Sequence, residues 1–144
     1  MNKAEVFELL NSSPICYLAT SENNIPHVRG MAMYRADEKG IIFHTGYMKD
    51  LYKQLNNDPN VELCFFNSDK NIQIRVSGKA IFIEDLELKK EIVENRPFLK
   101  PWVEKMGYDI LAVFRVVDCI GHTWSMKTNF SPKEYINLST TRLL

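Results

Sequence analysis

The sequence predicts a mainly β chain with inserted helices that closes into an antiparallel barrel. Seven short segments have the apolar runs or the alternation of strands, and several follow one another without a helix between them. The chain lacks the regular strand–helix alternation of a parallel sheet, and no G-x-G-x-x-G motif follows its first strand. Closure into a barrel is a common way in which such strands avoid exposed edges.

The first part of the chain reads as a helix, three strands and a second helix. Lys3–Leu10 has apolar residues at helical intervals and ends at an Asn-Ser-Ser-Pro cluster. Ile15–Thr20 is a compact apolar run, Pro26–Tyr34 alternates with a period of two, and the polar turn between them predicts a hairpin. An Asp-Glu-Lys-Gly turn leads into the third strand, Ile41–Thr45. From Met48 the apolar spacing becomes helical, and this helix ends at Asn-Asp-Pro.

The middle of the chain is predicted to form two strands and a helix. Val61–Phe66 and Ile72–Ile83 flank a Ser-Asp-Lys-Asn turn, and the second strand is the longest because its alternation continues over its whole length. Asp85–Glu94 has helical spacing, with acidic residues near its start that suit the positive end of the helix dipole.

The last part of the chain is less regular. Arg96–Gly107 contains two prolines, so it is either a short helical turn or a loop. Ile110–Val117 and Cys119–Ser125 are predicted to be two further strands joined through Asp118. The tail, residues 127–144, has little periodicity and is expected to lie on the surface.

Length and charge limit the organisation and the partners of the chain. With 144 residues, residues 1–144 are expected to form a single domain. Lysine plus arginine equal aspartate plus glutamate at 18 each, so nucleic acid and membrane are not expected partners and any anion site must be local. No stretch approaches the roughly 18 apolar residues of a membrane span, and no apolar run follows the charged N-terminus. Together with three cysteines in apolar surroundings, these features predict a cytoplasmic protein.

Residues 43–49 place a strand, a glycine turn and a helix in the order that is typical of an anion site. Backbone N–H groups at a helix start and the positive end of its dipole attract anions. Lys49, predicted in the first helical turn, opposes that dipole unless an anion lies there, and Thr45 adds a hydroxyl donor. A solvated lysine on a surface helix would explain the same residues.

Two strand residues are further candidates for binding. Arg29 can hold a phosphate with two parallel hydrogen bonds, and the adjacent Gly30 leaves room for a flat molecule against the backbone. Gln73 places an amide, both donor and acceptor, in an apolar strand. An exposed strand arginine is equally consistent with the pattern, and one amide does not identify a site.

The sequence identifies no catalytic group and no metal site. It has no G-x-S-x-G motif, and no serine or cysteine has the context of an activated nucleophile. His27, His44 and His122 lack the spacing of metal ligands and have no C-x-x-C companion.

Five segments occur in an order that resembles one known family. They are Arg29–Met33, His44–Lys49 and residues 58–64, 72–80 and 121–124. Together they resemble the pyridoxamine 5′-phosphate oxidase-like proteins, in the branch that includes nitroimidazole-resistance-type proteins. The resemblance implies a six- to seven-stranded antiparallel Greek-key split β-barrel that binds FMN. It also implies a homodimer with shared cofactor sites and a small-molecule substrate.

The resemblance assigns cofactor contacts to ten residues: Arg29, Gly30, Met31, Ala32, His44, Thr45, Lys49, Lys53, Gln73 and Trp124. In that assignment Lys49 holds the phosphate, with Lys53 one turn further on as a second cation. Gln73 matches the family's glutamine at the flavin edge, and Trp124 matches an aromatic residue near the cofactor. The remaining residues lie along the flavin or on the strand that leads to its phosphate.

The chain departs from the oxidases proper at three places. Asp50-Leu51 replaces their Arg-Lys pair, Tyr34 replaces a lysine, and Trp124 is not followed by their arginine and histidine motif. These departures argue against oxidation of pyridoxamine phosphate itself. We expect an FMN-dependent oxidoreductase that passes a hydride or electrons between a reduced nicotinamide and a small acceptor. A flavin-binding or redox-sensing module without turnover, or a deazaflavin reductase on the same barrel, are the alternatives.

Overall fold

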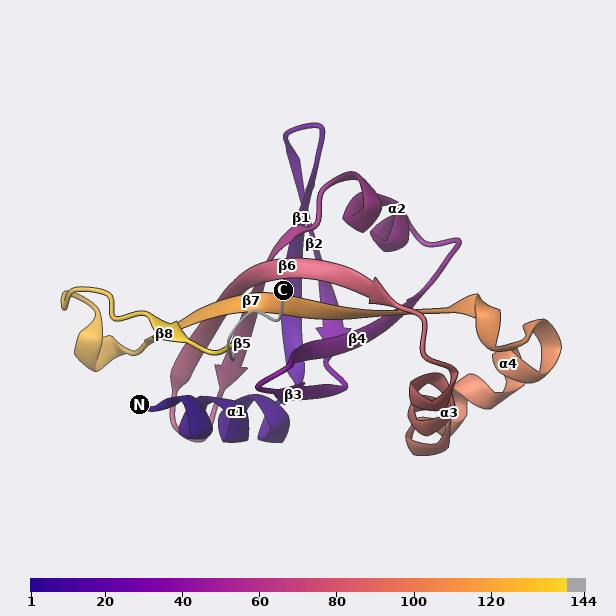
Figure 1. Cartoon of the computed structure of the whole chain (residues 1–144). Coiled ribbons are helices and arrows are strands. Elements are labelled where there is room, and N and C mark those ends of the chain that lie inside the picture. The colour runs from indigo at the N-terminus through magenta and orange to yellow at the C-terminus, as the bar shows by residue number, and fades with distance from the viewer. Residues whose placement is uncertain (140–144) are drawn as a thin grey trace.

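The computed structural model describes residues 1–139 and has a mainly antiparallel β-sheet with inserted helices (Figure 1). The strands are β1 (Ile15–Glu22), β2 (Ile25–Ala32), β3 (Arg35–Asp37), β4 (Gly40–Gly46), β5 (Asn60–Asn67), β6 (Ile72–Ile83), β7 (Leu111–Trp124) and β8 (Ile136–Asn137). The helices are α1 (Lys3–Ser12), α2 (Asp50–Asn57), α3 (Leu86–Asn95) and α4 (Lys100–Met106), and the 3₁₀ turns are η1 (Pro97–Leu99), η2 (Tyr108–Ile110) and η3 (Met126–Thr128). The predicted fold class is confirmed.

The sheet closes through the short segment between β2 and β3. Its hydrogen-bonded order is β2-β1-β5-β6-β7-β4-β3, so β2 and β3 lie at opposite edges although only Met33 and Tyr34 separate them. Met33 donates its N–H to the carbonyl of Pro14, just before β1, at 2.9 Å, and Tyr34 donates to the carbonyl of Ile42 in β4 at 2.9 Å. Adjacent residues therefore continue the β2–β1 and β3–β4 pairings, and the chain joins the two edge strands into a split barrel.

The long strand β7 corrects the prediction of two separate final strands. Residues 111–124 form one strand, and its register with β6 shifts beside Gly78. Asp118 adopts a positive φ of 54°, and a Cβ on Gly78 would lie 2.7 Å from the Val117 carbonyl oxygen. The two strands stay paired because a bulge with a glycine opposite bends β7 without ending it.

Two short strands were not predicted from the sequence. β3 follows the segment that the sequence assigned to the strand Pro26–Tyr34, and β8 lies in the tail. With these two strands added and the two final strands merged, the sheet has eight strands rather than six to seven.

The tail is anchored at its end and exposed before it. Leu138 is buried in the main core, and its N–H donates to the Cys119 carbonyl at 2.9 Å. β8 pairs with β7, whereas residues 126–135 are exposed. The expected surface tail is therefore correct only for this exposed part. Residues 140–144 of the predicted tail lie outside the described residues.

The barrel interior holds the main core, and two helices lie near its ends. Phe43, Phe65 and Phe114 are fully buried, and the rings of Phe43 and Phe114 stack with centroids 5.4 Å apart. α1 adds Leu10 to this core, and α2 packs mainly against β1 (Figure 1). In the described part of the chain no helix has the length and apolar character needed to cross a membrane.

A second, smaller core forms under α3. Ile42 of β4 and Val113 of β7 pack against Leu88 and Ile92 of α3, with Leu99 of η1 at the margin. The chain between β6 and β7 thus forms a helical projection, α3–η1–α4, on one side of the barrel (Figure 1). This projection places α4 across from the ends of β2 and β4.

Candidate functional site

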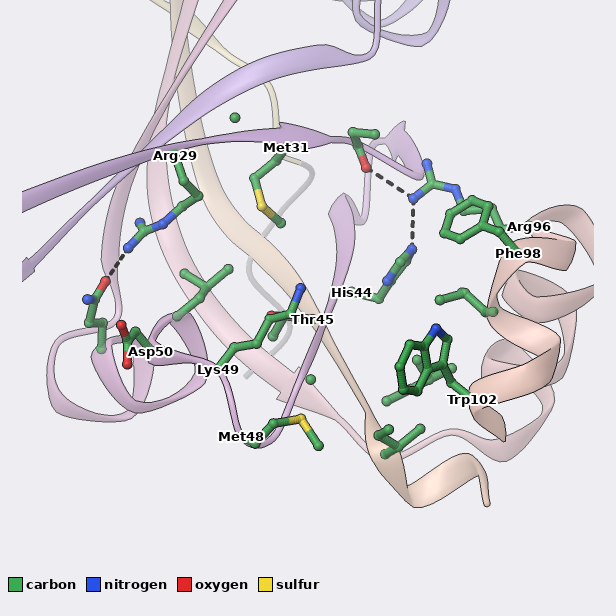
Figure 2. A pocket seen from close by; sticks show the side chains of 18 of the residues that line it. Arg29, Met31, His44, Thr45, Met48, Lys49, Asp50, Arg96, Phe98 and Trp102 are labelled. Carbon is green, nitrogen blue, oxygen red and sulfur yellow. Dashed lines mark hydrogen bonds between the residues drawn. The ribbon is translucent and has the colours of Figure 1, made fainter. Parts of the chain in front are cut away.

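A hollow of about 1150 Å³ opens between the barrel and the helical projection (Figure 2). Residues 27–32 of β2 and 44–46 of β4 form one side, the start of α2 forms the floor, and the η1–α4 segment forms the other side. Small-ligand sites usually measure roughly 300–1,000 Å³. The hollow is therefore large enough for a ligand of cofactor size.

Arg29 is held at one end of the hollow by oxygen acceptors. Its guanidinium donates to Thr20 Oγ1 at 2.9 Å, to the Leu18 carbonyl at 3.3 Å and to Gln54 Oε1. Gln54 is buried and also accepts the Thr20 hydroxyl at 2.7 Å. Burial lowers the pKa of Arg29, and the Asp50 carboxylate acts in the opposite direction. These contacts hold the positively charged Arg29 guanidinium in place at the end of the hollow.

The sequence predicted Lys49 in the first turn of α2, but the structure places it just before the helix. It is the N-cap residue and has an extended backbone, while Asp50 occupies the first turn. The Lys49 N–H donates to the Gly46 carbonyl at 3.1 Å, and this turn delays the start of the helix by one residue. The argument that Lys49 opposes the helix dipole is therefore weakened, because the Asp50 carboxylate already complements that end.

The side chains of Lys49 and Thr45 nevertheless both line the hollow (Figure 2). Lys49 forms no ion pair with any of residues 1–139. Thr45 is 6% exposed, and its hydroxyl has no hydrogen-bond partner among the same residues. A hydroxyl and an ammonium group that line the same hollow are donors suited to an anion.

Arg96 lies across the hollow from Arg29 and ties the helical projection to the barrel (Figure 2). Its guanidinium donates to the carbonyls of Ala32 at 3.1 Å and Met33 at 2.8 Å. It also lies over the Tyr34 ring, 5.3 Å from the centroid. Burial lowers the pKa of Arg96. Within residues 1–139 no carboxylate forms an ion pair with it.

His44 is a neutral acceptor for Arg96 at neutral pH. Its Nε2 lies 2.8 Å from Arg96 Nη1. Burial, and then the positive charges of Arg96 and Lys49, lower the pKa of His44 to about 4. Because a guanidinium only donates, Nε2 accepts and the ring proton belongs on Nδ1. His44 therefore adds no charge to the hollow at neutral pH.

The α4 side of the hollow is apolar. Phe98, Trp102 and Met106 line it, together with Leu99, Ile110 and Leu111. Figure 2 shows Trp102 pointing from α4 toward the barrel. The hollow thus combines a polar side on the barrel with an aromatic side on the helical projection.

The charge of the lining is positive although the whole chain is neutral. The lining contains three basic side chains, Arg29, Lys49 and Arg96, and one carboxylate, Asp50. The chain carries 18 basic and 18 acidic residues. Because the sequence indicated that any anion site must be local, this local excess of positive charge is where an anionic ligand would be favoured.

The structure brings seven of the ten sequence-predicted residues to the hollow: Arg29, Gly30, Met31, Ala32, His44, Thr45 and Lys49. Lys53, Gln73 and Trp124 do not line it. Lys53 is exposed on α2, and the neighbouring Gln54 turns into the hollow in its place. The helical rotation between consecutive residues explains this difference.

Gln73 and Trp124 lie together elsewhere on the sheet. They are register partners on β6 and β7, and Gln73 also pairs with Phe66 of β5. Arg75, two residues after Gln73 on β6, pairs with Cys64 of β5, and Cys64 pairs with Tyr17 of β1. Tyr17 in turn pairs with Gly30 of β2. Paired residues and those two apart along a strand share a sheet face. Gln73 and Trp124 therefore share the outer sheet face with Gly30, which also lines the hollow.

This outer sheet face carries several exposed large hydrophobic side chains around the ion pair of Arg75 and Glu62. Its exposed large hydrophobic side chains are Ile15, Tyr17, Val28, Phe66 and Ile120. Contiguous exposed apolar patches commonly mark protein interfaces. The face is a candidate contact surface that continues into the hollow at β2.

Sequence reasoning missed Arg96, Gln54 and the aromatic side of the hollow. Arg96 contacts Ala32 and Met33, more than 60 residues away, and no local pattern reveals such a contact. A signal for the aromatic side was present, because Phe98, Trp102 and Met106 recur at intervals of four residues. The two prolines in this segment obscured it.

Comparisons with known proteins agree with this geometry. Residues 3–108 match the family model described as pyridoxamine 5′-phosphate oxidase. A pyridoxine/pyridoxamine 5′-phosphate oxidase from Chromohalobacter salexigens is 24% identical over 110 residues, which are 74% of this chain and 51% of that protein. The chain spans about half the length, or less, of the curated relatives it matches.

Solved structures share the whole fold. A NimC/NimA family protein from Clostridium acetobutylicum superposes with a TM-score of 0.75 and 26% identity, covering 93% of this chain and 91% of that chain. A protein from Mesorhizobium loti described as FAD-binding superposes with a TM-score of 0.60 and 14% identity, covering 87% and 96% of the two chains. The second likeness is evidence for the fold alone.

Proposed function

The chain belongs to the pyridoxamine 5′-phosphate oxidase family, and from that premise we propose that it is an FMN-binding oxidoreductase whose cofactor occupies the hollow. The observation that carries the proposal is the donor set at the end of β4. There the Thr45 hydroxyl and the Lys49 ammonium, which forms no ion pair with residues 1–139, line the hollow beside the start of α2. FMN ends in a phosphate, which needs such donors.

The rest of the lining suits the remainder of the cofactor. β2 is an edge strand, so the backbone groups on its free side have no strand partner and are available to the polar edge of a flavin ring. A Cβ added to Gly30 would meet only the Tyr17 ring, at 3.9 Å, so the backbone is open to a flat molecule there. Arg29 would orient the ribityl phosphate from its fixed position. The Mesorhizobium loti protein with this fold is described as FAD-binding, which agrees with a flavin site.

A bound flavin would supply hydride or single-electron transfer to and from a small molecule. The protein's residues would hold it, exclude water and set the local charge. His44, with a pKa lowered to about 4, would remain neutral near the ring and is not a proton donor at neutral pH. Asp50 is the one carboxylate among the lining residues, so the lining offers no evident acid–base pair. Chemistry that needs only positioned hydride transfer fits this lining best.

We further propose that the protein works as a homodimer through the outer sheet face. Gly30 belongs to both this face and the hollow, so a second copy packed there would border the cofactor. Gln73 and Trp124 would then serve the site of the second copy, which explains why they lie outside the hollow of their own chain. The apolar side chains of the face provide the driving force for association.

The visible spectrum of the purified protein tests the proposed function. We expect FMN absorbance, either as isolated or after adding FMN and removing the excess, and bleaching by NADH or NADPH. Stable flavin absorbance without bleaching would favour a flavin-binding or redox-sensing module without turnover. A colourless protein that ignores FMN but binds a deazaflavin would replace the proposal by the reductase alternative.

A further inference from the structure

The apolar side of the hollow carries a largely exposed hydrophobic face. Phe98, Trp102 and Met106 are spaced four residues apart, so they share one face of the η1–α4 segment. All three line the hollow, yet they are 66%, 56% and 52% exposed. The neighbouring α3, by contrast, buries Ile92 and Val93. Large exposed aromatic side chains gathered in a cavity favour a flat apolar ligand.

The charge beside this face limits the ligand further. Arg96 immediately precedes η1, lines the same hollow and has no carboxylate partner among residues 1–139. A half-buried guanidinium that bonds only carbonyl oxygens and a neutral imidazole keeps its full positive charge. The proposed function uses Lys49 and Arg29 for the cofactor phosphate, so Arg96 is the cation that remains. One free cation matches a ligand with a single negative charge.

We propose that the face formed by Phe98, Trp102 and Met106, the α4 face, selects the substrate of this protein as a planar aromatic carboxylate. Its ring would lie on Trp102 and Phe98, and its carboxylate would lie toward Arg96. The substrate assignment rests on the proposed function, because the opposite side of the hollow is given to the flavin. The α4 face itself makes a binding claim that can be tested with or without flavin.

The two tryptophans of the chain make the test direct. Trp102 lines the hollow and Trp124 lies on the outer sheet face, so the variant Trp124→Phe leaves Trp102 as the sole tryptophan. This variant is used only for emission from protein without FMN, because Trp124 is assigned to the proposed cofactor site of the second copy, and calorimetry on the original protein covers the FMN-treated state. The probe is benzoate, added to FMN-treated protein and, separately, to protein without FMN. Benzamide keeps the ring and removes the charge, and cyclohexanecarboxylate keeps the charge and removes the flat ring. Trp102 emission and titration calorimetry report binding.

We expect benzoate to change Trp102 emission in a saturable way and to bind roughly tenfold or more tightly than either analogue, as for loss of one stacked or charge-assisted contact. Trp102→Leu should weaken benzoate about three- to tenfold. Phe130→Leu is the matched control, because Phe130 is 98% exposed and lies outside the hollow. Far-ultraviolet circular dichroism checks that each variant is folded.

Three outcomes would overturn the inference. Equal binding of benzoate and cyclohexanecarboxylate would remove the aromatic requirement. Unchanged affinity in a folded Trp102→Leu variant would place the ligand elsewhere. If Trp102 emission changed with protein concentration but not with added benzoate, a second copy of the chain would cover the α4 face. Absence of FMN binding would refute the proposed function, and the titration without FMN would still decide whether the α4 face binds the probe.

Discussion

At the scale of single residues, the unpaired ammonium of Lys49 leads to a specific prediction. Lys49→Ala should weaken FMN by roughly 1.5–3 kcal/mol, the range for a charge-assisted hydrogen bond. Riboflavin lacks the phosphate and should bind the variant and the original protein almost equally. Fluorescence titration of both flavins measures this difference. Equal losses for both would mean that the substitution disturbed the fold.

Lys53 provides the matched control for Lys49. It carries the same charge four residues further along the chain but is exposed on α2 and does not line the hollow. Lys53→Ala should therefore leave FMN affinity nearly unchanged. A loss as large as that of Lys49→Ala would restore Lys53 as the second phosphate cation that the family resemblance implies.

The low pKa of His44 predicts how stability depends on pH. A folded-state pKa of about 4, below the ordinary histidine pKa of 6.5, means that the unfolded chain binds more protons between these values. Stability should therefore fall as pH decreases from 6.5 toward 4, by at most about 1.4 kcal/mol per pH unit from this group. Urea unfolding of the flavin-free protein at several pH values measures the slope. His44→Gln should flatten it, and an unchanged slope would assign the effect to other groups.

At the scale of secondary-structure elements, Arg96 joins the helical projection to the barrel. Arg96→Met removes two hydrogen bonds to the carbonyls of Ala32 and Met33 and should destabilise the protein by roughly 1.5–3 kcal/mol. It should also raise the pKa of His44, because the Arg96 charge is one cause of its depression. Urea unfolding and an NMR titration of His44 measure the two effects.

Arg35 provides a control for Arg96, because it is another arginine that contacts α3. Its guanidinium pairs with Glu91 of α3 at 3.1 Å, and both side chains are 43% exposed. Exposed ion pairs contribute about 1 kcal/mol or less, so Arg35→Met should cost less than Arg96→Met and leave the His44 pKa nearly unchanged. Equal losses of unfolding free energy in Arg35→Met and Arg96→Met would show that α3 is held by its packing on Ile42 and Val113 rather than by Arg96.

At the scale of the whole molecule, the outer sheet face predicts association. Sedimentation should give twice the chain mass of 16.8 kDa. The double substitution Tyr17→Glu and Val28→Glu, at side chains 62% and 68% exposed, should give a folded monomer because it puts charges on the apolar contact surface. A monomeric original protein that binds FMN tightly would contradict the shared site.

Mixed dimers test whether Gln73 acts on the second copy. Gln73→Leu should weaken FMN by roughly 1–3 kcal/mol and shift the flavin reduction potential, because buried polar ring atoms lose a partner. If Gln73 acts in the other subunit, a dimer of one Lys49→Ala chain and one Gln73→Leu chain contains one intact site. Titration of such mixed dimers should then recover one tight FMN site per dimer. Failure to recover it would place Gln73 in its own chain's site, whereas unchanged FMN affinity of the Gln73→Leu homodimer would place Gln73 away from the cofactor.

Several local features of this protein could be predicted from the sequence. The alternation over Ile72–Ile83 and the Asn-Ser-Ser-Pro and Asn-Asp-Pro breakers set the positions of β6, α1 and α2. The glycine turn with Thr45 and Lys49 indicated an anion site before any geometry was known. These features depend on neighbours within a few residues, and local patterns record such neighbours directly.

Other features were decided only by the tertiary structure. The bulge at Asp118 keeps β7 continuous because β6 presents Gly78 there, and the barrel closes because Met33 pairs beside β1 while the adjacent Tyr34 pairs with β4. Arg96 reaches the hollow through carbonyls that lie far away in the sequence, and α4 is held opposite β2 by the small core under α3. Each of these contacts joins segments that are distant along the chain, so the sequence by itself determined the candidate residues, whereas packing decided which of them share one hollow.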